Sequence, residues 1–409
     1  MVSTAELAAF TTDVDHDRLP EVVRTALKNR VLDAVGIAVD ASDRPPVDTV
    51  RRSIAAQNVA GRSRLWATEL SASPPDAALY NATLLGAGNG AVFLSPTLGT
   101  PSDSIAAVFA AGEAYNANGE DILAGLAAAF EIHGELSWTA PLDGVDPSTH
   151  SALAATAGVG RTLGFESDRL ETALDIVAFR PARPISRDDG FEAVAGGVAA
   201  REAIYACVLA DNGLSAPEVT DDHPLGRGDL DLDPGCERVL DAAVLPYDTH
   251  PYAQSAIEAA IDLAEGATLD PADVESVRIV TAREATEHVD EIAVAAALVD
   301  RELSRLPSGR VDLEPIAESV SVEVDDDARV GRGETPTKLS VDCRGGAGYE
   351  REKRWFTGHP ASPVSWGVVE DKFTALASDR YDGERRREIL DTVEGLEAET
   401  AVELCRLLD

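Results

Sequence analysis

The segment around His250 gathers side chains that are suited to acid/base chemistry. Tyr247 and Asp248 precede the histidine and Tyr252 follows it. A carboxylate close to an imidazole can set the tautomer and the charge of the ring, which a proton-transfer pair requires. His250 and Asp248 are therefore catalytic candidates. The alternative is a loop histidine with local hydrogen bonds, because one histidine next to an acid is a weak signal.

The densest loop cluster of cations contains Arg180, Arg183 and Arg187. Guanidinium groups bind carboxylates through paired hydrogen bonds, so Arg183 and Arg187 are candidates for binding a di- or tricarboxylate. Glu192 lies just downstream and is a candidate base. The alternative is a loop whose arginines form ion pairs with such acidic neighbours. His150 stands near the start of a predicted helix, where helix capping is the alternative to substrate binding.

The elements that must position these residues are helices over the first two thirds of the chain. Between residues 22 and 38, apolar side chains recur at spacings of three and four, which gives a helix with one apolar face. Similar patterns predict helices over 76–86, 104–115, 120–136, 151–163, 168–177, 191–209 and 252–265. The helical period returns over 365–377 and 383–408. These patterns predict a large all-helical domain built from both chain ends.

The pattern changes to alternation after about residue 269. Apolar and polar side chains alternate over 274–280, 319–324 and 338–343, which predicts three strands. A glycine-rich turn at 344–348 predicts a hairpin to a fourth strand over 349–356, and a helix is expected over 291–303. We therefore predict a mainly α protein with a smaller α+β lid domain. The expected boundaries are 1–266 and 359–409 for the helical domain and 267–358 for the lid.

The charge of the chain excludes whole classes of partner. The 409 residues include 72 Asp and Glu against 35 Lys and Arg, a formal net charge of −37. Phosphate would repel such a protein, so we expect no nucleic-acid partner. The longest apolar run, 122–130, is much shorter than the roughly 20 residues that cross a bilayer, and the start of the chain does not resemble a signal peptide. We expect no membrane association and a cytoplasmic location.

The acids are spread along the chain, which indicates adaptation to high salt. Salt at high concentration shortens the Debye length and screens the self-repulsion of the surface. An ordinary acidic cytosolic protein is the alternative.

Motifs for common cofactors do not occur. The four cysteines form no C-x-x-C, and G-x-G-x-x-G after a strand, the P-loop, H-E-x-x-H and G-x-S-x-G are all missing. Residues 13–17 (DVDHD) offer metal-friendly side chains, but they lack the glycine and the final glutamate of an EF-hand, so a solvated loop is expected. We expect neither a metal nor an organic cofactor.

Motifs along nearly the whole chain resemble the MmgE/PrpD family, which includes 2-methylcitrate dehydratase, cis-aconitate decarboxylase and iminodisuccinate epimerase. Residues 31–38 (VLDAVGIA) resemble the family's first-helix signature, and 77–83 (AALYNAT) its A-x-x-N-G-T stretch. Residues 118–131 resemble the G-x-D-L-L helix, and 358–373 the closing motif. The resemblance implies a helical domain with an α+β lid domain, the architecture that the periodicities also indicate.

The family's catalytic residues are largely replaced. Where its members carry an H-A-x-D-[FY]-D-D-T-H-like string, whose polar residues line a pocket between the domains, residues 85–94 are LGAGNGAVFL, with Asn89 at an aspartate position. The K-x-x-H-x-G-x-A motif becomes 192–199 and begins with Glu192. K-P-Y-x-x-C-x-x-x-H becomes 245–254, with Tyr247 kept, His250 at the cysteine and Gln254 at the histidine. The resemblance adds Asn89 as a catalytic candidate, and Tyr247 and Gln254 as substrate-binding candidates.

Two hypotheses follow. The first is a lyase or isomerase, similar to the family's dehydratases and decarboxylases, that acts on a small di- or tricarboxylate in a rebuilt pocket between the domains. The alternative is a catalytically inactive family member that serves as a structural or regulatory partner. The family's helical dimer interface implies a homodimer or a hetero-oligomer with an active paralogue.

Overall fold

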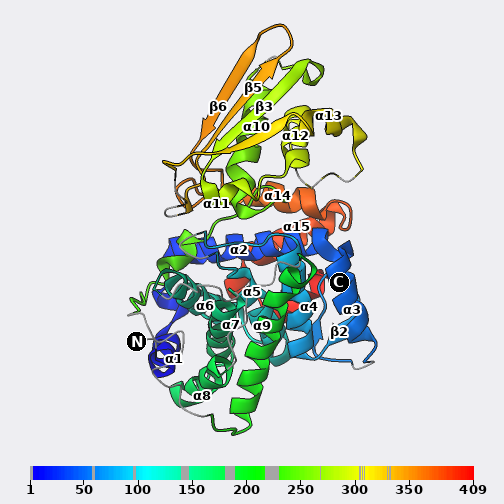
Figure 1. Cartoon of the computed structure of the whole chain (residues 1–409). Coiled ribbons are helices and arrows are strands. Elements are labelled where there is room, and N and C mark those ends of the chain that lie inside the picture. The colour runs from blue at the N-terminus through cyan, green and yellow to red at the C-terminus, as the bar shows by residue number, and fades with distance from the viewer. Residues whose placement is uncertain are drawn as a thin grey trace. The chain divides into compact units, whose positions relative to one another are not determined.

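In the computed structural model, the helices of the first two thirds of the chain pack against one another (Figure 1). Many of the side chains that they bury are alanines. Gly125 of α6 (Gly119–Thr139) is smaller still: a Cβ there would lie 2.6 Å from the carbonyl oxygen of Gly158 in α7 (Ser148–Thr162). Only glycine permits this approach. The structure describes residues 3–57, 60–94, 98–139, 147–179, 189–216, 230–267, 269–303, 305, 307, 309–328, 330 and 333–409.

The first of two units is helical and contains both chain ends, as Met1–Phe93, Thr97–Ala242 and Ser365–Asp409. Besides α6 and α7, its helices are α1 (Thr4–Asp13), α2 (Glu21–Asp40), α3 (Pro45–Ala55), α4 (Pro74–Ala87), α5 (Ser102–Tyr115), α8 (Ser167–Ala178), α9 (Asp189–Asp211), α14 (Trp366–Ala377), α15 (Gly383–Glu394) and α16 (Ala401–Leu407). The short strands β1 (Ser63–Arg64) and β2 (Ser71–Ala72) pair antiparallel. The predicted helical domain from both chain ends is confirmed.

The two ends of the chain meet where α2 packs on α14. A Cβ on Gly36 would lie 3.2 Å from the Cα of Phe373, so the helix backbones approach closely. One turn away, Lys372 Nζ donates a hydrogen bond to Asp33 Oδ1 at 2.6 Å, and Asp33 is 1% exposed. An ion pair with a buried carboxylate thus links positions 339 residues apart.

The second unit holds the predicted sheet, with strand order β4-β3-β5-β6. Strand β3 (Val274–Thr281) pairs parallel with β4 (Val320–Val324) and antiparallel with β5 (Thr337–Cys343), which pairs antiparallel with β6 (Gly348–Lys353). The β5–β6 turn contains Gly345 and Gly346 at φ 103° and 87°, a left-handed conformation that favours glycine. The four strands and the hairpin agree with the sequence-based prediction. The helices of this unit are α10 (Gln254–Gly266), α11 (Arg283–Thr286), α12 (Glu291–Asp300) and α13 (Glu314–Ala317).

The second unit begins earlier in the chain than the change of period indicates. It comprises Leu94–Pro96 and Ala243–Val364, whereas the sequence suggests 267–358. The difference arises because α10 has a helical period but belongs to the core of the sheet, where Ile257 is buried together with Leu339. At the other end, His359 stays in this unit because its Nε2 lies 3.1 Å from the carbonyl oxygen of Gly333.

Candidate functional site

The first candidate site lies where the N-terminal ends of α5 and α7 meet. Asp103, in the first turn of α5, is 1% exposed. Its Oδ2 accepts hydrogen bonds from the Thr100 hydroxyl at 2.7 Å and the Ser151 hydroxyl at 2.8 Å. Helix N-termini favour negative charge, so this position suits a carboxylate. We call Thr100, Asp103 and Ser151 the Asp103 cluster.

Helix α9 closes the Asp103 cluster from a third side. A Cβ on Gly196 would lie 2.3 Å from Asp103 Oδ1, which is closer than side chains approach one another. The next residue, Gly197, packs in the same way against α4, because its Cβ would lie 2.5 Å from the carbonyl oxygen of Leu79. Two adjacent glycines therefore let α9 pass directly beside the buried carboxylate.

A pair of buried histidines lies in the same unit. His150 of α7 and His133 of α6 are both 0% exposed, and their rings meet edge to face with centroids 6.2 Å apart. Neither ring nitrogen of His133 has a hydrogen-bond partner within the described part of the chain. Burial, together with His150, holds the pKa of His133 well below its usual value, so the ring is neutral. His150 is the third residue of α7, and the N-cap position of this helix is Pro147.

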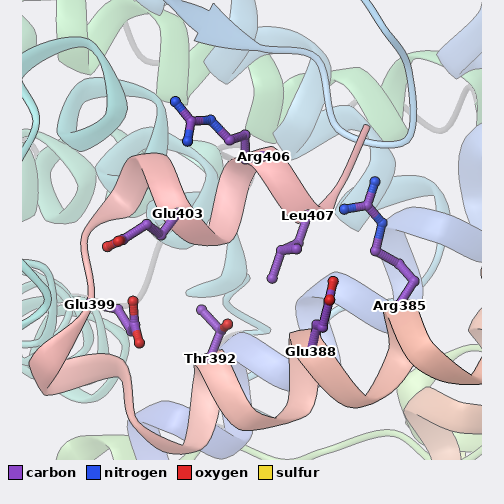
Figure 2. A pocket seen from close by; sticks show the side chains of 7 residues that line it. All are labelled: Arg385, Glu388, Thr392, Glu399, Glu403, Arg406 and Leu407. Atoms are coloured by element: carbon purple, nitrogen blue, oxygen red, sulfur yellow. The ribbon is translucent and has the colours of Figure 1, made fainter.

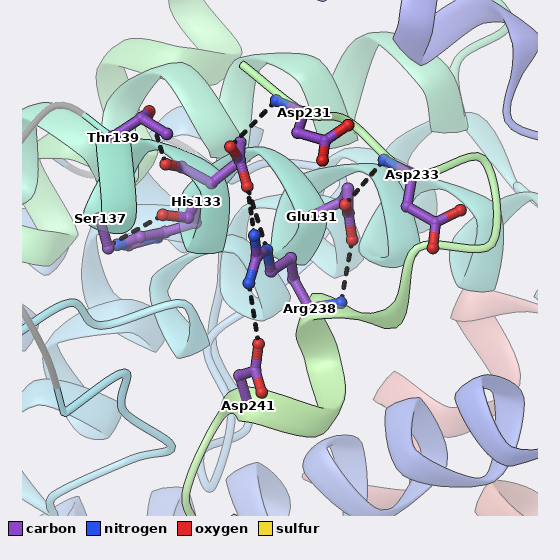
Figure 3. A network of polar contacts seen from close by, with 9 residues as sticks. Glu131, His133, Ser137, Thr139, Asp231, Asp233, Arg238 and Asp241 are labelled. Atoms are coloured by element: carbon purple, nitrogen blue, oxygen red, sulfur yellow. Dashed lines mark hydrogen bonds and ion pairs between the residues drawn. The ribbon is translucent and has the colours of Figure 1, made fainter. Parts of the chain in front are cut away.

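The carboxylates on the opposite side of α6 have a structural role, as Figure 3 shows. Glu131 accepts hydrogen bonds from the backbone N–H groups of Asp233 at 3.0 Å and Arg238 at 2.9 Å. Glu135 accepts from the N–H of Asp231 and from the Arg238 guanidinium, with Nη2 at 2.6 Å. Burial raises the pKa of Glu131 to about 7, against the two N–H donors, which lower it. These residues anchor the segment 231–241.

His250 lies in the second unit and stacks on another histidine. Its ring is parallel to that of His288, with a 3.6 Å centroid separation and a 5° angle, and Tyr252 packs edge-on at 5.3 Å. His250 Nδ1 accepts the backbone N–H of Tyr252 at 3.2 Å, so the ring proton belongs on Nε2. Burial, with a smaller contribution from His288, lowers the pKa of His250 to about 3. The ring is neutral near pH 7 and supplies no positive charge for an anionic substrate. Asp248 is half-buried in the same segment.

Gln254 and Tyr247 are joined by hydrogen bonds that fold the loop before α10. Gln254 is 0% exposed. Its Nε2 donates to the carbonyl oxygens of Tyr247 at 2.9 Å and Thr249 at 3.0 Å, while its Oε1 accepts the N–H of Tyr247 at 3.1 Å. Burial also raises the pKa of the Tyr247 phenol. The Gln254 amide thus holds the loop, and contact with a substrate would have to replace some of these bonds.

The remaining predicted residues are Asn89, Glu192, Arg183 and Arg187. Asn89 has a left-handed φ of 59° directly after α4, where the N–H of Gly90 donates to the carbonyl oxygen of Leu85 at 3.0 Å. Asparagine tolerates this conformation, so helix termination accounts for its place. Glu192 is exposed near the start of α9. Arg183 and Arg187 lie outside the described residues.

Asp103 is not among the residues that the sequence predicts for the site, although a local signal for it exists. Thr100 and Asp103 stand three residues apart around a proline at a helix start, a pattern typical of N-terminal capping. The contact with Ser151, 48 residues away, depends on the packing of α5 against α7. No signal in the sequence marks His133 as a site residue, because it lies within an apolar helix.

A surface groove between α15 and α16 has mixed charge (Figure 2). It measures about 360 Å³ and is lined by Arg385, Glu388, Thr392, Glu399, Glu403, Arg406 and Leu407. Three carboxylates against two guanidinium groups leave no excess of positive charge for a polyanionic substrate. Within the described ranges, no group of three or more His, Cys, Asp or Glu side chains is placed to hold a metal ion.

Comparison with known proteins bears on the helical unit. Residues 5–231 match the family model described as the MmgE/PrpD N-terminal domain, which is more than half of the chain. A search of curated proteins found no match.

Proposed function

The chain belongs to the MmgE/PrpD family, and from this premise we propose that it acts as a lyase or isomerase on a small di- or tricarboxylate. The resemblance of its motifs to those of the family's dehydratases and decarboxylases supports the reaction class. A cytoplasmic location is part of the same proposal. So is adaptation to high salt, because the excess of 37 negative charges needs screening.

The Asp103 carboxylate is the observation that carries the proposal. Removal of a proton next to a carboxylate needs a base and donors that stabilise the negative charge that develops. Asp103 supplies a base inside the helical unit, and the hydroxyls of Thr100 and Ser151 fix its orientation. The neighbouring ends of α5 and α7 present helix N-termini, which favour an anionic ligand.

The substrate's own carboxylates also require cations. His250 is neutral near pH 7, so it cannot take this role in its present surroundings. Arg183 and Arg187 stay the predicted substrate-binding residues, because arginine remains charged at any pH of interest. Tyr247 and Gln254 are less suited, since their polar groups already hold the loop at residues 247–249.

A second candidate function is that of a catalytically inactive partner. The specific observation that favours it is the state of the histidines: His133 is buried and neutral, and His250 is stacked on His288 with its Nδ1 already engaged. The lowered pKa makes His133 and His250 weak bases, and the Nδ1 lone pair of His250 already accepts a hydrogen bond. In this case the family fold would serve assembly and not turnover.

Ligand binding separates the two functions. We expect at least one di- or tricarboxylate, tested from citrate downward in size, to raise the melting temperature in 2 M KCl, because a ligand at 100 times its Kd stabilises the folded state by about 2.7 kcal/mol. The double variant Arg183→Ser/Arg187→Ser should lose the effect. Arg169→Ser, which removes an exposed arginine on α8, should keep it. If no ligand shifts the wild-type protein, the enzyme proposal fails and the inactive partner is favoured.

A further inference from the structure

A buried phenol without a hydrogen-bond partner belongs to α4, on which α3 packs (Figure 1). Tyr80 of α4 is 0% exposed, and its hydroxyl oxygen has no partner among the residues that the structure describes. Arg51 of α3 contributes a second such group, because its Nε is also buried and has no partner within the described ranges. Buried polar groups normally have hydrogen-bond partners, so these two groups require an explanation.

Two guanidinium groups act on this phenol. Burial raises the pKa of Tyr80 to about 12, and the positive charges of Arg51 and Arg380 oppose that rise. Asp43 and Asp48 make smaller contributions in the same direction as burial. The phenol therefore stays protonated near pH 7, and its O–H is available as a donor.

The positive charge around the phenol exceeds the negative charge. Arg51 and Arg52 both form an ion pair with the same carboxylate, that of Asp48. Arg380 adds a third guanidinium group, so the arginines outnumber the two carboxylates of Asp43 and Asp48. The whole chain has the opposite balance, with 72 acids against 35 bases. A local excess of positive charge favours a negatively charged ligand.

The two groups without partners are donors, and their burial limits the size of what can bind. The Nε–H of Arg51 can only donate, and the protonated phenol of Tyr80 can donate its O–H. The ligand must therefore accept hydrogen bonds, and the nearby guanidinium groups favour an anion over a neutral acceptor. Because both atoms are buried, a monatomic anion suits the site and a di- or tricarboxylate does not. Chloride has this charge and this size.

We propose that Tyr80 and Arg51 bind a chloride ion between α4 and α3, with Arg380 supplying further positive charge. The ion stabilises a junction of distant segments, because Arg380 follows α14 and its Nη2 also donates a hydrogen bond to the carbonyl oxygen of Ala67 at 2.5 Å. The proposal is independent of the catalytic one, since it uses no residue of the Asp103 cluster and concerns an ion much smaller than the proposed substrates.

The dependence of stability on chloride tests the site. With potassium held at 2 M, chloride replaces acetate in steps, and urea unfolding gives the free energy of unfolding. Above the Kd, each tenfold rise in chloride should raise the folding equilibrium constant of the wild-type protein about tenfold, which is about 1.4 kcal/mol. Tyr80→Phe should lose this dependence. In acetate alone, Tyr80→Phe should be at least as stable as the wild-type protein, because it removes a buried hydroxyl that has no partner.

Arg51→Gln and Arg52→Gln form a matched pair of variants, because each removes one ion pair with Asp48. Only Arg51→Gln should weaken the dependence on chloride, since the Arg52 side chain is 71% exposed and Arg51 Nε is buried. The proposal is wrong if the wild-type protein depends on chloride no more than Tyr80→Phe does. An equal effect of Arg52→Gln would also overturn it, because the effect would then come from the ion pairs with Asp48.

Bromide can locate the ion directly, because it replaces chloride and scatters X-rays anomalously. In crystals of the wild-type protein equilibrated with KBr, we expect an anomalous peak within hydrogen-bond distance of Tyr80 Oη and Arg51 Nε. The peak should be weaker in Tyr80→Phe. Electron density at this position without an anomalous signal would identify a water molecule and would refute the chloride site.

Discussion

Replacing Lys372 by methionine should destabilise the helical unit far more than the same replacement at Lys28. Both lysines belong to this unit, both form an ion pair, and their side chains are similarly exposed, at 18% and 17%. They differ in the partner: Asp33 is 1% exposed, whereas the Glu397 side chain is 27% exposed. Lys28 Nζ also donates a hydrogen bond to the carbonyl oxygen of Glu394 at 2.8 Å, so the control variant loses an additional contact and the comparison tests the burial of the carboxylate conservatively.

The magnitudes follow from that difference. Removing one partner of a buried pair leaves an uncompensated charge and costs about 3–5 kcal/mol. The Lys372 ammonium keeps some contact with water, so we expect about 3 kcal/mol for Lys372→Met. Lys28→Met should cost about 1 kcal/mol or less, as for pairs near the surface. Substituting both partners, Asp33→Leu/Lys372→Met, should recover most of the loss, because no charge is left buried.

Urea unfolding in 2 M KCl, followed by circular dichroism, measures these differences as shifts of the midpoint. The high salt matters because it screens exposed pairs more than buried ones, so the contrast between the two lysines should persist there. A loss for Lys372→Met no greater than that for Lys28→Met would refute the reasoning. It would mean that the link between the two chain ends depends on packing alone.

Three further predictions concern single groups. Glu131→Gln should cost about 1–3 kcal/mol in urea unfolding, since an amide N–H₂ would face a backbone N–H donor, while exposed Glu120→Gln should be neutral. The lowered pKa of His250 means that its contribution to the free energy of unfolding is complete above pH 6.5 and is lost as the pH falls toward 3. At pH 5 the free energy of unfolding should have fallen by about 1–2 kcal/mol. This loss should be smaller in His250→Asn. Gly196→Ala should lower the melting temperature, because its Cβ would collide with Asp103, whereas Gly367→Ala, which has room, should not.

Most of the fold could be predicted from the sequence because its patterns are local. Alternation over 274–280 and 338–343 marks strands, and paired glycines mark the hairpin turn at the left-handed φ that the structure shows. Helix α10 shows the limit of such patterns. Its apolar face predicts a helix but does not say which core covers it, and the structure places Ile257 under the sheet. The predicted helix over 383–408 is two helices, because α15 ends at Gly395 and Thr400 caps α16.

The candidate site could be predicted only in part, because its contacts join distant residues. The sequence pointed to His250 through its neighbour Asp248, but the ring stacks on His288, which lies 38 positions later and is placed by the fold around α11. Asp103 has a local signal for helix capping alone, and its bond to Ser151 arises from helix packing. The roles of Asn89, Glu192, Arg183 and Arg187 stay predictions.

The most direct test of the proposed chemistry is proton exchange in heavy water. Incubated with a panel of di- and tricarboxylates in deuterated 2 M KCl, the wild-type protein should exchange a hydrogen next to a carboxylate for deuterium in at least one compound, as proton NMR would show. Asp103→Asn should abolish the exchange. Asp175→Asn, which alters another buried aspartate with a threonine hydroxyl donor at 2.6 Å, should preserve it. Exchange that persists in Asp103→Asn, or that never occurs in the wild-type protein, would contradict the assignment of Asp103 as the base.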